Sequence, residues 1–200
     1  SDRSCEKFRR TLYRTCQCTS ASQTNGTAPI TRMPRKAFAE MPAFSASGFV
    51  DQAARHQATC ASLFAGPIRM ILARGGPPSA DVAPLRLRHC WYAQNLTPAQ
   101  YDTIASWLGC RPRQLYGMTE TIPAVLTDDA RAPQCDTMGY VTPGCTVELD
   151  EGEIVVGGEP GITLFAGYLD DPATTAASCS DGWFRTGDRA HRDEQGRFVF

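Results

Sequence analysis

Three short strings in the second half of the chain combine glycines with side chains that carry oxygen ligands. Residues 116–121 read YGMTET, residues 152–157 read GEIVVG and residues 182–188 read GWFRTGD. A carboxylate such as that of Glu120 is a hard oxygen ligand that suits Mg²⁺, which shares its remaining positions with water and phosphates. The carboxylate of Asp188 can accept two hydrogen bonds side by side. Taken singly, Thr-Glu is also a common helix start and Gly-Asp a common surface turn, so the strings gain meaning from their order.

In this order the three strings resemble the middle motifs of the adenylate-forming enzymes, the acyl-CoA synthetase and ligase superfamily. The resemblance covers about residues 44–200 and includes GYL at 167–169 and DPATT at 171–175. It implies an AMP-forming acid–thiol ligase, in which ATP activates a carboxylic acid as an acyl-adenylate that is then transferred to coenzyme A. The implied ligands are ATP or AMP, Mg²⁺ and coenzyme A as co-substrate, and the implied setting is fatty acid metabolism.

The resemblance also implies roles for individual residues. The hydroxyl of Thr119 would contact the α-phosphate and Glu120 would help to hold Mg²⁺, so these two are the candidate catalytic residues. Such groups are needed because charge grows on the phosphoryl oxygens when a carboxylate attacks the α-phosphorus. Asp188 would accept hydrogen bonds from both ribose hydroxyls, which its two oxygens match. Gly117 allows close backbone approach, and Tyr116 offers a flat face for adenine or an acyl chain.

The adenine side departs from the family pattern. The family usually places a run rich in Gly and Ala against the base, whereas residues 90–95 here read CWYAQN. Trp91 or Tyr92 could stack on adenine or narrow the acyl pocket, although the alternating pattern around Trp91 favours core packing. Gln114 stands where the family often has Asn or Asp near the adenine amino group and is included as a nucleotide-binding candidate. Residues 152–157 are interpreted as a structural strand without a catalytic role.

Two further parts of the family's machinery have no counterpart in the sequence. Adenylation in the family uses a Ser/Thr/Gly-rich phosphate loop that ends in Lys, and a second Lys on a mobile carboxy-terminal domain. This chain has Lys only at positions 7 and 36. We therefore expect a fragment of an acyl-CoA synthetase that is inactive by itself. The alternative is a truncated non-catalytic remnant or nucleotide-binding module.

Composition excludes several other classes. The net charge is −1, so no strong positive field favours nucleic acid or membrane binding. The nine Cys lack a C-x-x-C pair and His is scattered, which argues against a metal knuckle and favours reduced thiols in a cytoplasmic protein. No apolar run is long enough for a transmembrane segment. Residues 1–40 carry eight Lys/Arg against three Asp/Glu and show no sustained periodicity, which predicts a disordered or foreign segment.

Helix signals follow from residue 41. Ser45 or Ser47 can cap a helix with an apolar side, and Pro67 lies in the tolerated first turn of a second helix that ends at the GGPP of residues 75–78. Thr97-Pro98-Ala99-Gln100 is a capping box whose helix ends at Gly109. Asp171 can cap a later helix that has Pro172 at its first position. The apolar positions of the first and third helices are Phe49, Val50, Ala53 and Ala54, and Tyr101, Ile104, Trp107 and Leu108.

Strand signals set the fold class. Residues 85–92 alternate with a period of two and residues 111–115 form a second short strand candidate, which together with the helices predicts an α/β part over residues 41–135. After residue 136, short apolar runs separated by Gly and Pro predict a small β-rich, distorted barrel-like subdomain over residues 136–200. The predicted fold class is thus α/β, a partial mixed layer followed by this subdomain, with the YGMTET string of residues 116–121 at a strand end.

Overall fold

The computed structural model describes residues 43–200 except 94 and 123. The chain divides into two units, residues 1–37 and 38–200, and the helices and strands that follow belong to the second. The expectation for residues 1–40 lies outside the described residues. The helices of the second unit are α2 (Phe49–Arg55), α3 (Ala65–Arg74), α4 (Pro98–Leu108), the 3-10 turn η1 (Thr119–Thr121) and α5 (Pro172–Ser178).

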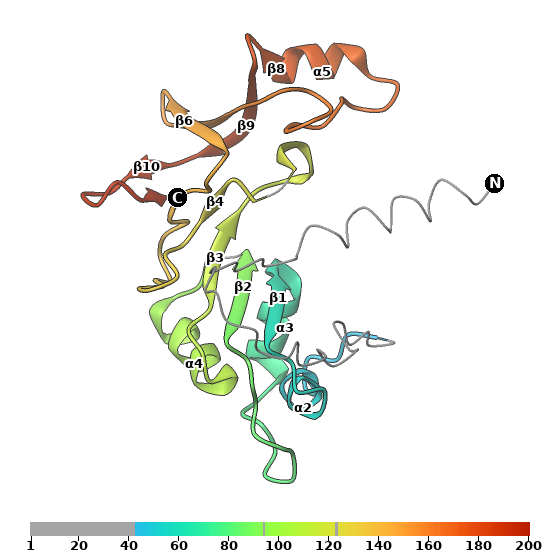
Figure 1. The fold of residues 1–200 in the computed structure, drawn as a ribbon, viewed down its shortest axis with the longest axis vertical. Helices are drawn as coiled ribbons and strands as arrows, with labels where there is room; N and C mark the ends of the chain where they lie inside the picture. The colour runs from blue at the N-terminus through green and yellow to red at the C-terminus, as the bar shows by residue number, and fades with distance from the viewer. Residues whose placement is uncertain (1–42, 94, 123) are drawn as a thin grey trace, which may run out of the picture. The chain divides into compact units, whose positions relative to one another are not determined.

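A five-stranded mixed sheet forms the α/β part. Its strands lie in the order β1 (Cys60–Phe64), β2 (His89–Ala93), β3 (Arg113–Tyr116), β4 (Leu126–Thr127) and β5 (Tyr140–Val141). The first three are parallel, and β4 and β5 join antiparallel. Figure 1 shows β1, β2 and β3 running in one direction, with α2 and α3 near β1 and α4 next to β3. Strands joined through helices in a mixed sheet are the α/β arrangement that the sequence predicted.

One hydrophobic core joins these helices to one face of the sheet. The apolar sides predicted for two helices are confirmed, because Phe49, Val50, Ala53 and Ala54 of α2 and Tyr101, Ile104 and Leu108 of α4 are buried. Trp107 is partly buried and packs against the same core. Leu63, Cys90 and Tyr92 supply the strand side of the same core. Burial of the larger aliphatic and Phe side chains of this core stabilises the fold by about 1.5–3 kcal/mol each.

The predicted caps are formed for α4 and α5. Thr97 Oγ1 accepts from the Gln100 N–H at 3.3 Å and Gln100 Oε1 accepts from the Thr97 N–H at 3.0 Å, which completes the capping box. Gly109 ends α4 with a φ of 68°, a left-handed conformation that Gly adopts without penalty. The cap predicted for α2 was wrong, since its N-cap is Gly48 and the Ser45 hydroxyl only accepts from the Gly48 N–H.

The strand predicted over residues 85–92 needs a correction. Only His89–Ala93 pairs in the sheet, and its buried side chains are Cys90 and Tyr92 rather than Trp91. Trp91 lies half-buried on the other face, where it stacks on His89 with ring centroids 5.8 Å apart and the Arg113 guanidinium lies over its ring. The prediction therefore assigned the buried positions to the wrong alternate residues. Buried Leu87 lies before the strand, and the exposed residues 88 and 89 separate it from buried Cys90, which shifts the alternation by one position.

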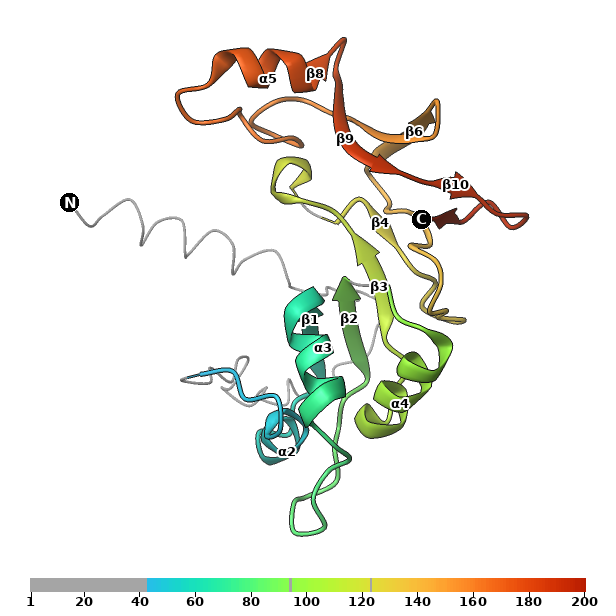
Figure 2. The same cartoon turned by 180° about the vertical axis from the view of Figure 1, so that it is seen from behind.

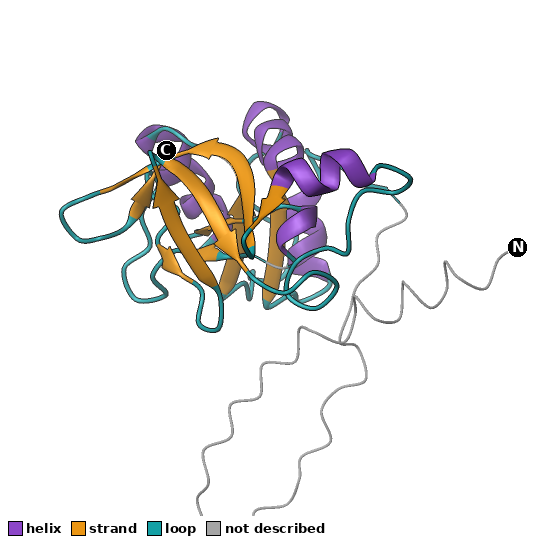
Figure 3. Cartoon of the chain, turned by 90° about the horizontal axis from the view of Figure 1, so that it is seen from above, coloured by secondary structure: helices purple, strands orange, loops and turns teal. Residues whose placement is uncertain are grey.

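The β-rich part contains an open sheet. Four strands lie in the order β6 (Thr146–Asp150), β7 (Glu153–Gly157), β9 (Trp183–Arg189) and β8 (Cys179–Ser180), all antiparallel. Seen from above, the strands do not close into a ring among the described residues (Figure 3). The remaining strands, β10 (His191–Arg192) and β11 (Phe198–Val199), form a hairpin. The boundary near residue 135 stays a prediction.

Candidate functional site

Tyr116 is the last residue of β3 and connects the two parts of the unit. Along β3, Gln114 and Tyr116 are buried while Arg113 and Leu115 are partly exposed, so the first two lie on one face of the strand. The ring of Tyr116 belongs to the second hydrophobic core, together with residues such as Phe184 and Phe198. β3 therefore brings the YGMTET string to the side of the sheet at which its parallel strands end (Figure 2).

Asp188 reaches Tyr116 from β9. The Tyr116 hydroxyl donates to Asp188 Oδ2 at 2.7 Å, although the two residues are 72 positions apart in the sequence. Burial raises the pKa of the Tyr116 hydroxyl well above its ordinary value, the Thr186 hydroxyl opposes this and the Asp188 carboxylate adds to it. Tyr116 therefore stays protonated and remains the donor of this hydrogen bond, while Asp188 keeps a second oxygen for another ligand.

A cavity of about 230 Å³ lies beside Tyr116. Gln114, Tyr116 and Gly117 line it from β3 and the following loop, and Asn95 and Phe200 contribute to the wall. Gln114 Nε2 donates to Asn95 Oδ1 at 3.3 Å, whereas Gln114 Oε1 is buried without a partner among the described residues. An unsatisfied buried carbonyl costs about 1–3 kcal/mol, so a hydrogen-bond donor from a ligand or from water would stabilise this atom.

Thr119 and Glu120 follow in η1. Thr119 is exposed and Glu120 is half-buried. Glu120 Oε1 accepts from the Tyr168 hydroxyl at 3.1 Å, and the Glu120 carbonyl accepts from the Phe165 N–H at 2.8 Å. These two contacts anchor the Glu120 side chain and backbone to the segment before α5. The carboxylate is held through Oε1, and its other oxygen takes no part in the hydrogen bond with Tyr168.

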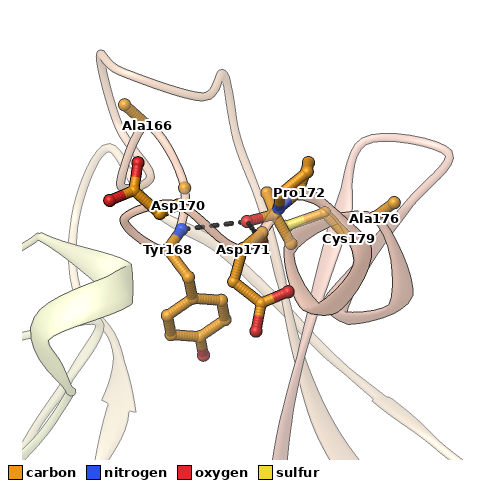
Figure 4. A pocket seen from close by; sticks show the side chains of 9 residues that line it. Ala166, Tyr168, Asp170, Asp171, Pro172, Ala176 and Cys179 are labelled. Carbon is orange, nitrogen blue, oxygen red and sulfur yellow. Dashed lines mark hydrogen bonds between the residues drawn. The ribbon is translucent and has the colours of Figure 1, made fainter.

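Tyr168 also lines a second, wider cavity of about 460 Å³ between the segment at 166–171 and α5 (Figure 4). The Tyr168 N–H donates to Thr175 Oγ1 at 2.9 Å, which fixes the start of this segment against α5. Asp171 Oδ1 accepts from the Thr174 N–H at 2.9 Å, as predicted for the cap of α5. The Glu120–Tyr168 hydrogen bond thus links η1 to the wall of this cavity.

The structure brings together some of the predicted site residues. Tyr116 contacts Asp188, and the smaller cavity joins Tyr116 to Gly117 and Gln114. Thr119, Glu120 and Asp188 are not among the residues that line that cavity. Their roles in nucleotide and metal binding stay predictions.

Sequence reasoning missed several residues around the site. The missed side chains are Asn95, Tyr168 and Phe200, whose ring packs edge-on against Tyr116 with centroids 5.8 Å apart, and Glu153 and Thr186, which accept from the backbone N–H groups of Gly187 and Asp188 respectively. Asn95, Tyr168 and Phe200 lie far along the chain from the residues that they contact, whereas Glu153 and Thr186 lie within the strings at 152–157 and 182–188. A pairing of residues 152–157 with residues 182–188 in one antiparallel sheet would have pointed to Glu153 and Thr186.

Comparison with known proteins decides the family. Residues 35–169 match the family model described as AMP-binding enzyme. The chain belongs to this family. The match spans α2 to the segment before α5, and it includes the YGMTET and GEIVVG strings.

Curated AMP-binding relatives share about a third of the residues. Crotonobetaine/carnitine–CoA ligases from Shigella flexneri serotype 5b (strain 8401) and Escherichia coli O157:H7 are each 32% identical, over 200 and 199 aligned residues. The matches cover 92% of this chain and 37% of each relative. The chain therefore spans little more than a third of the length of these relatives.

Solved structures with the same fold include two acyl-CoA-forming enzymes. The benzoate CoA ligase of Burkholderia xenovorans LB400 matches with a TM-score of 0.64 and 21% identity, over 78% of this chain and 33% of that chain. The O-succinylbenzoate coenzyme A synthetase of Bacillus subtilis, in complex with ATP and magnesium ion, matches with a TM-score of 0.62 and 22% identity, over 78% and 34%. The AMP-binding family fold is thus present in the described part. Within that part, no helix is both long and apolar enough to cross a bilayer.

Proposed function

We propose that this chain supplies the base and ribose side of the nucleotide site of an ATP-dependent acyl-CoA ligase. The contact between Tyr116 and Asp188 carries the proposal, because it joins two motifs 72 residues apart next to a cavity with an unpaired acceptor. A carboxylate beside a cavity suits the two hydroxyls of a ribose. Gln114 Oε1 is an acceptor, and the adenine amino group is a donor that would satisfy it.

The phosphate and metal side of the site would come from η1. Thr119 is exposed at the start of η1 and would donate to the α-phosphate. Glu120 would share Mg²⁺ with phosphate oxygens, which fits a metal that uses one or two carboxylates and substrate phosphates. The metal would neutralise charge on the phosphates. A carboxylic acid and coenzyme A are the co-substrates that this proposal implies.

Nucleotide binding without chemistry is the second candidate. One observation favours it: residues 41–200 contain no Lys, so this part of the chain offers no ammonium group to a developing phosphoryl charge. A chain of this kind would bind AMP or ATP through Tyr116, Gln114 and Asp188 without turnover. Binding and turnover must therefore be measured separately.

The binding test compares two variants of the full chain by NMR titration with AMP. Asp188→Ala removes the proposed ribose acceptor, whereas Asp102→Ala removes the same charge from the exposed face of α4. Hydrogen bonds to charged groups contribute roughly 1.5–3 kcal/mol each. AMP affinity should therefore fall by one to a few powers of ten for Asp188→Ala, at about 1.4 kcal/mol per tenfold. It should be unchanged for Asp102→Ala.

Amide shifts in the unaltered chain should gather at Tyr116, Gly117 and Gly187. GMP should bind more weakly than AMP, because its 6-oxo group offers no donor to Gln114 Oε1. A chain that shows no AMP-dependent shifts, or whose Asp188→Ala variant binds AMP with full affinity, contradicts the proposal.

A further inference from the structure

Asp188 sits in an irregular stretch of β9. Glu153 pairs with Arg189 and Val155 pairs with Arg185, so β7 advances by two residues where β9 advances by four. The additional residues of β9 therefore leave the regular ladder between these two pairs. Such bulges re-aim a side chain and leave backbone groups without ladder partners. Here the bulge turns the Asp188 carboxylate towards Tyr116.

Two side chains make hydrogen bonds to the backbone where the regular pairing of β7 and β9 is interrupted. Glu153 Oε1 accepts from the Gly187 N–H at 3.0 Å. Thr186 Oγ1 accepts from the Asp188 N–H at 3.1 Å and donates to the Ile154 carbonyl at 2.7 Å. Gly187 has a φ of 77°, a conformation that favours Gly, so the bulge turns sharply just before Asp188.

The other oxygen of Glu153 binds Arg185 on the far side of the bulge. Glu153 Oε2 accepts from Arg185 Nε at 3.0 Å and Nη2 at 2.7 Å, and Arg185 Nη1 donates to Asp150 Oδ2 at 2.7 Å. The Glu153 side chain is 19% exposed, against 54% for Asp150. Exposed ion pairs of this kind contribute little to stability, so the bond to the Gly187 N–H distinguishes Glu153 from Asp150.

We infer that Glu153 is a positioning residue, which clamps the bulge and thereby aims the Asp188 carboxylate at a ribose. The inference rests on the proposed nucleotide site. Glu153 contacts Gly187 and Arg185, and it acts on the ligand only through Asp188. The residue lies in the GEIVVG string, to which sequence analysis assigned only a structural strand.

The test compares variants of the full chain for their preference for AMP over 2′,3′-dideoxy-AMP, measured by NMR titration. Glu153→Ala removes the clamp, Glu153→Gln keeps an oxygen for the Gly187 N–H, and Glu153→Asp keeps the charge on a shorter side chain. Asp150→Ala is the control, because it breaks the ion pair with Arg185 but leaves the bulge untouched. The exchange rate of the Gly187 amide in water is the second measurement.

Glu153→Ala and Glu153→Asp should lower the preference for AMP about tenfold, the size of one lost hydrogen bond. They should also speed exchange of the Gly187 amide by about the same factor. Glu153→Gln and Asp150→Ala should keep the preference. If Glu153→Ala does not fold, Glu153→Asp decides the question.

The two measurements distinguish failure of the proposed Glu153 clamp from failure of the proposed nucleotide site. Unchanged Gly187 exchange in Glu153→Ala or Glu153→Asp overturns the clamp, and so does an Asp150→Ala variant that loses the preference as strongly. An unaltered chain that binds AMP and its dideoxy analogue equally overturns the ribose role of Asp188 itself. In that case Gly187 exchange still reports whether Glu153 holds the bulge.

Discussion

The hydroxyl of Tyr116 donates to Asp188 Oδ2 across 2.7 Å, and this bond ties the end of β3 to the bulge of β9. Each residue belongs to a different part of the unit, one at the end of the mixed sheet and the other in the open sheet. A nucleotide that used Asp188 would find one carboxylate oxygen already oriented by Tyr116. The bond therefore links the base side of the proposed site to its ribose side.

A double-mutant cycle measures this link. Tyr116→Phe keeps the ring in its core and removes the donor, and Asp188→Ala removes the acceptor. Because both groups are in contact, we expect a coupling energy of about 1 kcal/mol in the free energy of unfolding, from urea titrations of the four chains. The same cycle with Asp102→Ala in place of Asp188→Ala should give additive effects, since Asp102 is exposed on α4. Additivity in the first cycle would show that the bond does not stabilise the fold.

Glu120 carries the prediction for the metal. Glu120→Gln keeps an oxygen that can accept from Tyr168 but removes the negative charge that Mg²⁺ prefers. We expect the Mn²⁺ concentration that half-broadens the amide signals near residue 120, in the presence of ATP, to rise about tenfold. Tyr168→Phe is the matched comparison, because it removes the hydrogen-bond partner and leaves the charge. Equal Mn²⁺ sensitivity in Glu120→Gln and the unaltered chain would remove Glu120 from the metal site.

The helices could be predicted because their signals are local. The Thr97 capping box, the turn at Gly109 and the Asp171 cap each depend on residues within one or two helical turns, and all three are formed. The strands were harder, because their burial depends on neighbours far along the chain. β1 (Cys60–Phe64) went unpredicted since only Leu63 is buried in it, which leaves no alternation to detect.

The candidate site likewise has residues that the sequence could reveal and residues that it could not. The order of the motifs pointed to Tyr116 and Asp188 through resemblance to a family, and no local periodicity could have placed them in contact. Glu153 was interpreted as part of a plain strand because its partner, the Gly187 N–H, becomes available only where β9 bulges. A bulge is a property of two paired strands, so a single strand's sequence does not reveal it.

Turnover by the 200-residue chain alone is expected to be absent. Residues 41–200 contain no Lys, and the family that the motifs resemble uses Lys in adenylation. Isotope exchange between pyrophosphate and ATP, with a panel of fatty and aromatic acids, should stay at the level of a blank. A denatured sample of the same chain is the control. Clear exchange would contradict the interpretation as a partial enzyme.

The free energy of unfolding should decrease at alkaline pH, because two buried groups have a higher pKa in the folded chain than in the unfolded chain. Burial raises the pKa of the Cys90 thiol to about 12, with a smaller effect of Cys110, and burial likewise raises the pKa of the Tyr101 hydroxyl to about 12. Both groups are therefore protonated in the folded state at a pH where the unfolded chain has lost these protons. Their contribution to stability is present below pH 9.0 for Cys and 10.0 for Tyr, the ordinary pKa values, and is lost as pH rises towards about 12.

The free energy of unfolding in urea should thus be level from about pH 7 to pH 8.5 and fall steeply above about pH 9. Tyr101→Phe removes one of the titrating groups and also the hydroxyl that donates to the Pro112 carbonyl at 2.7 Å. This variant should be less stable at neutral pH, because the carbonyl loses its donor, but its stability should decline less between pH 10 and pH 12. An equal decline in both chains would show that Tyr101 has the same pKa in the folded and unfolded states. The burial of Tyr101 in the hydrophobic core of the α/β part predicts the opposite.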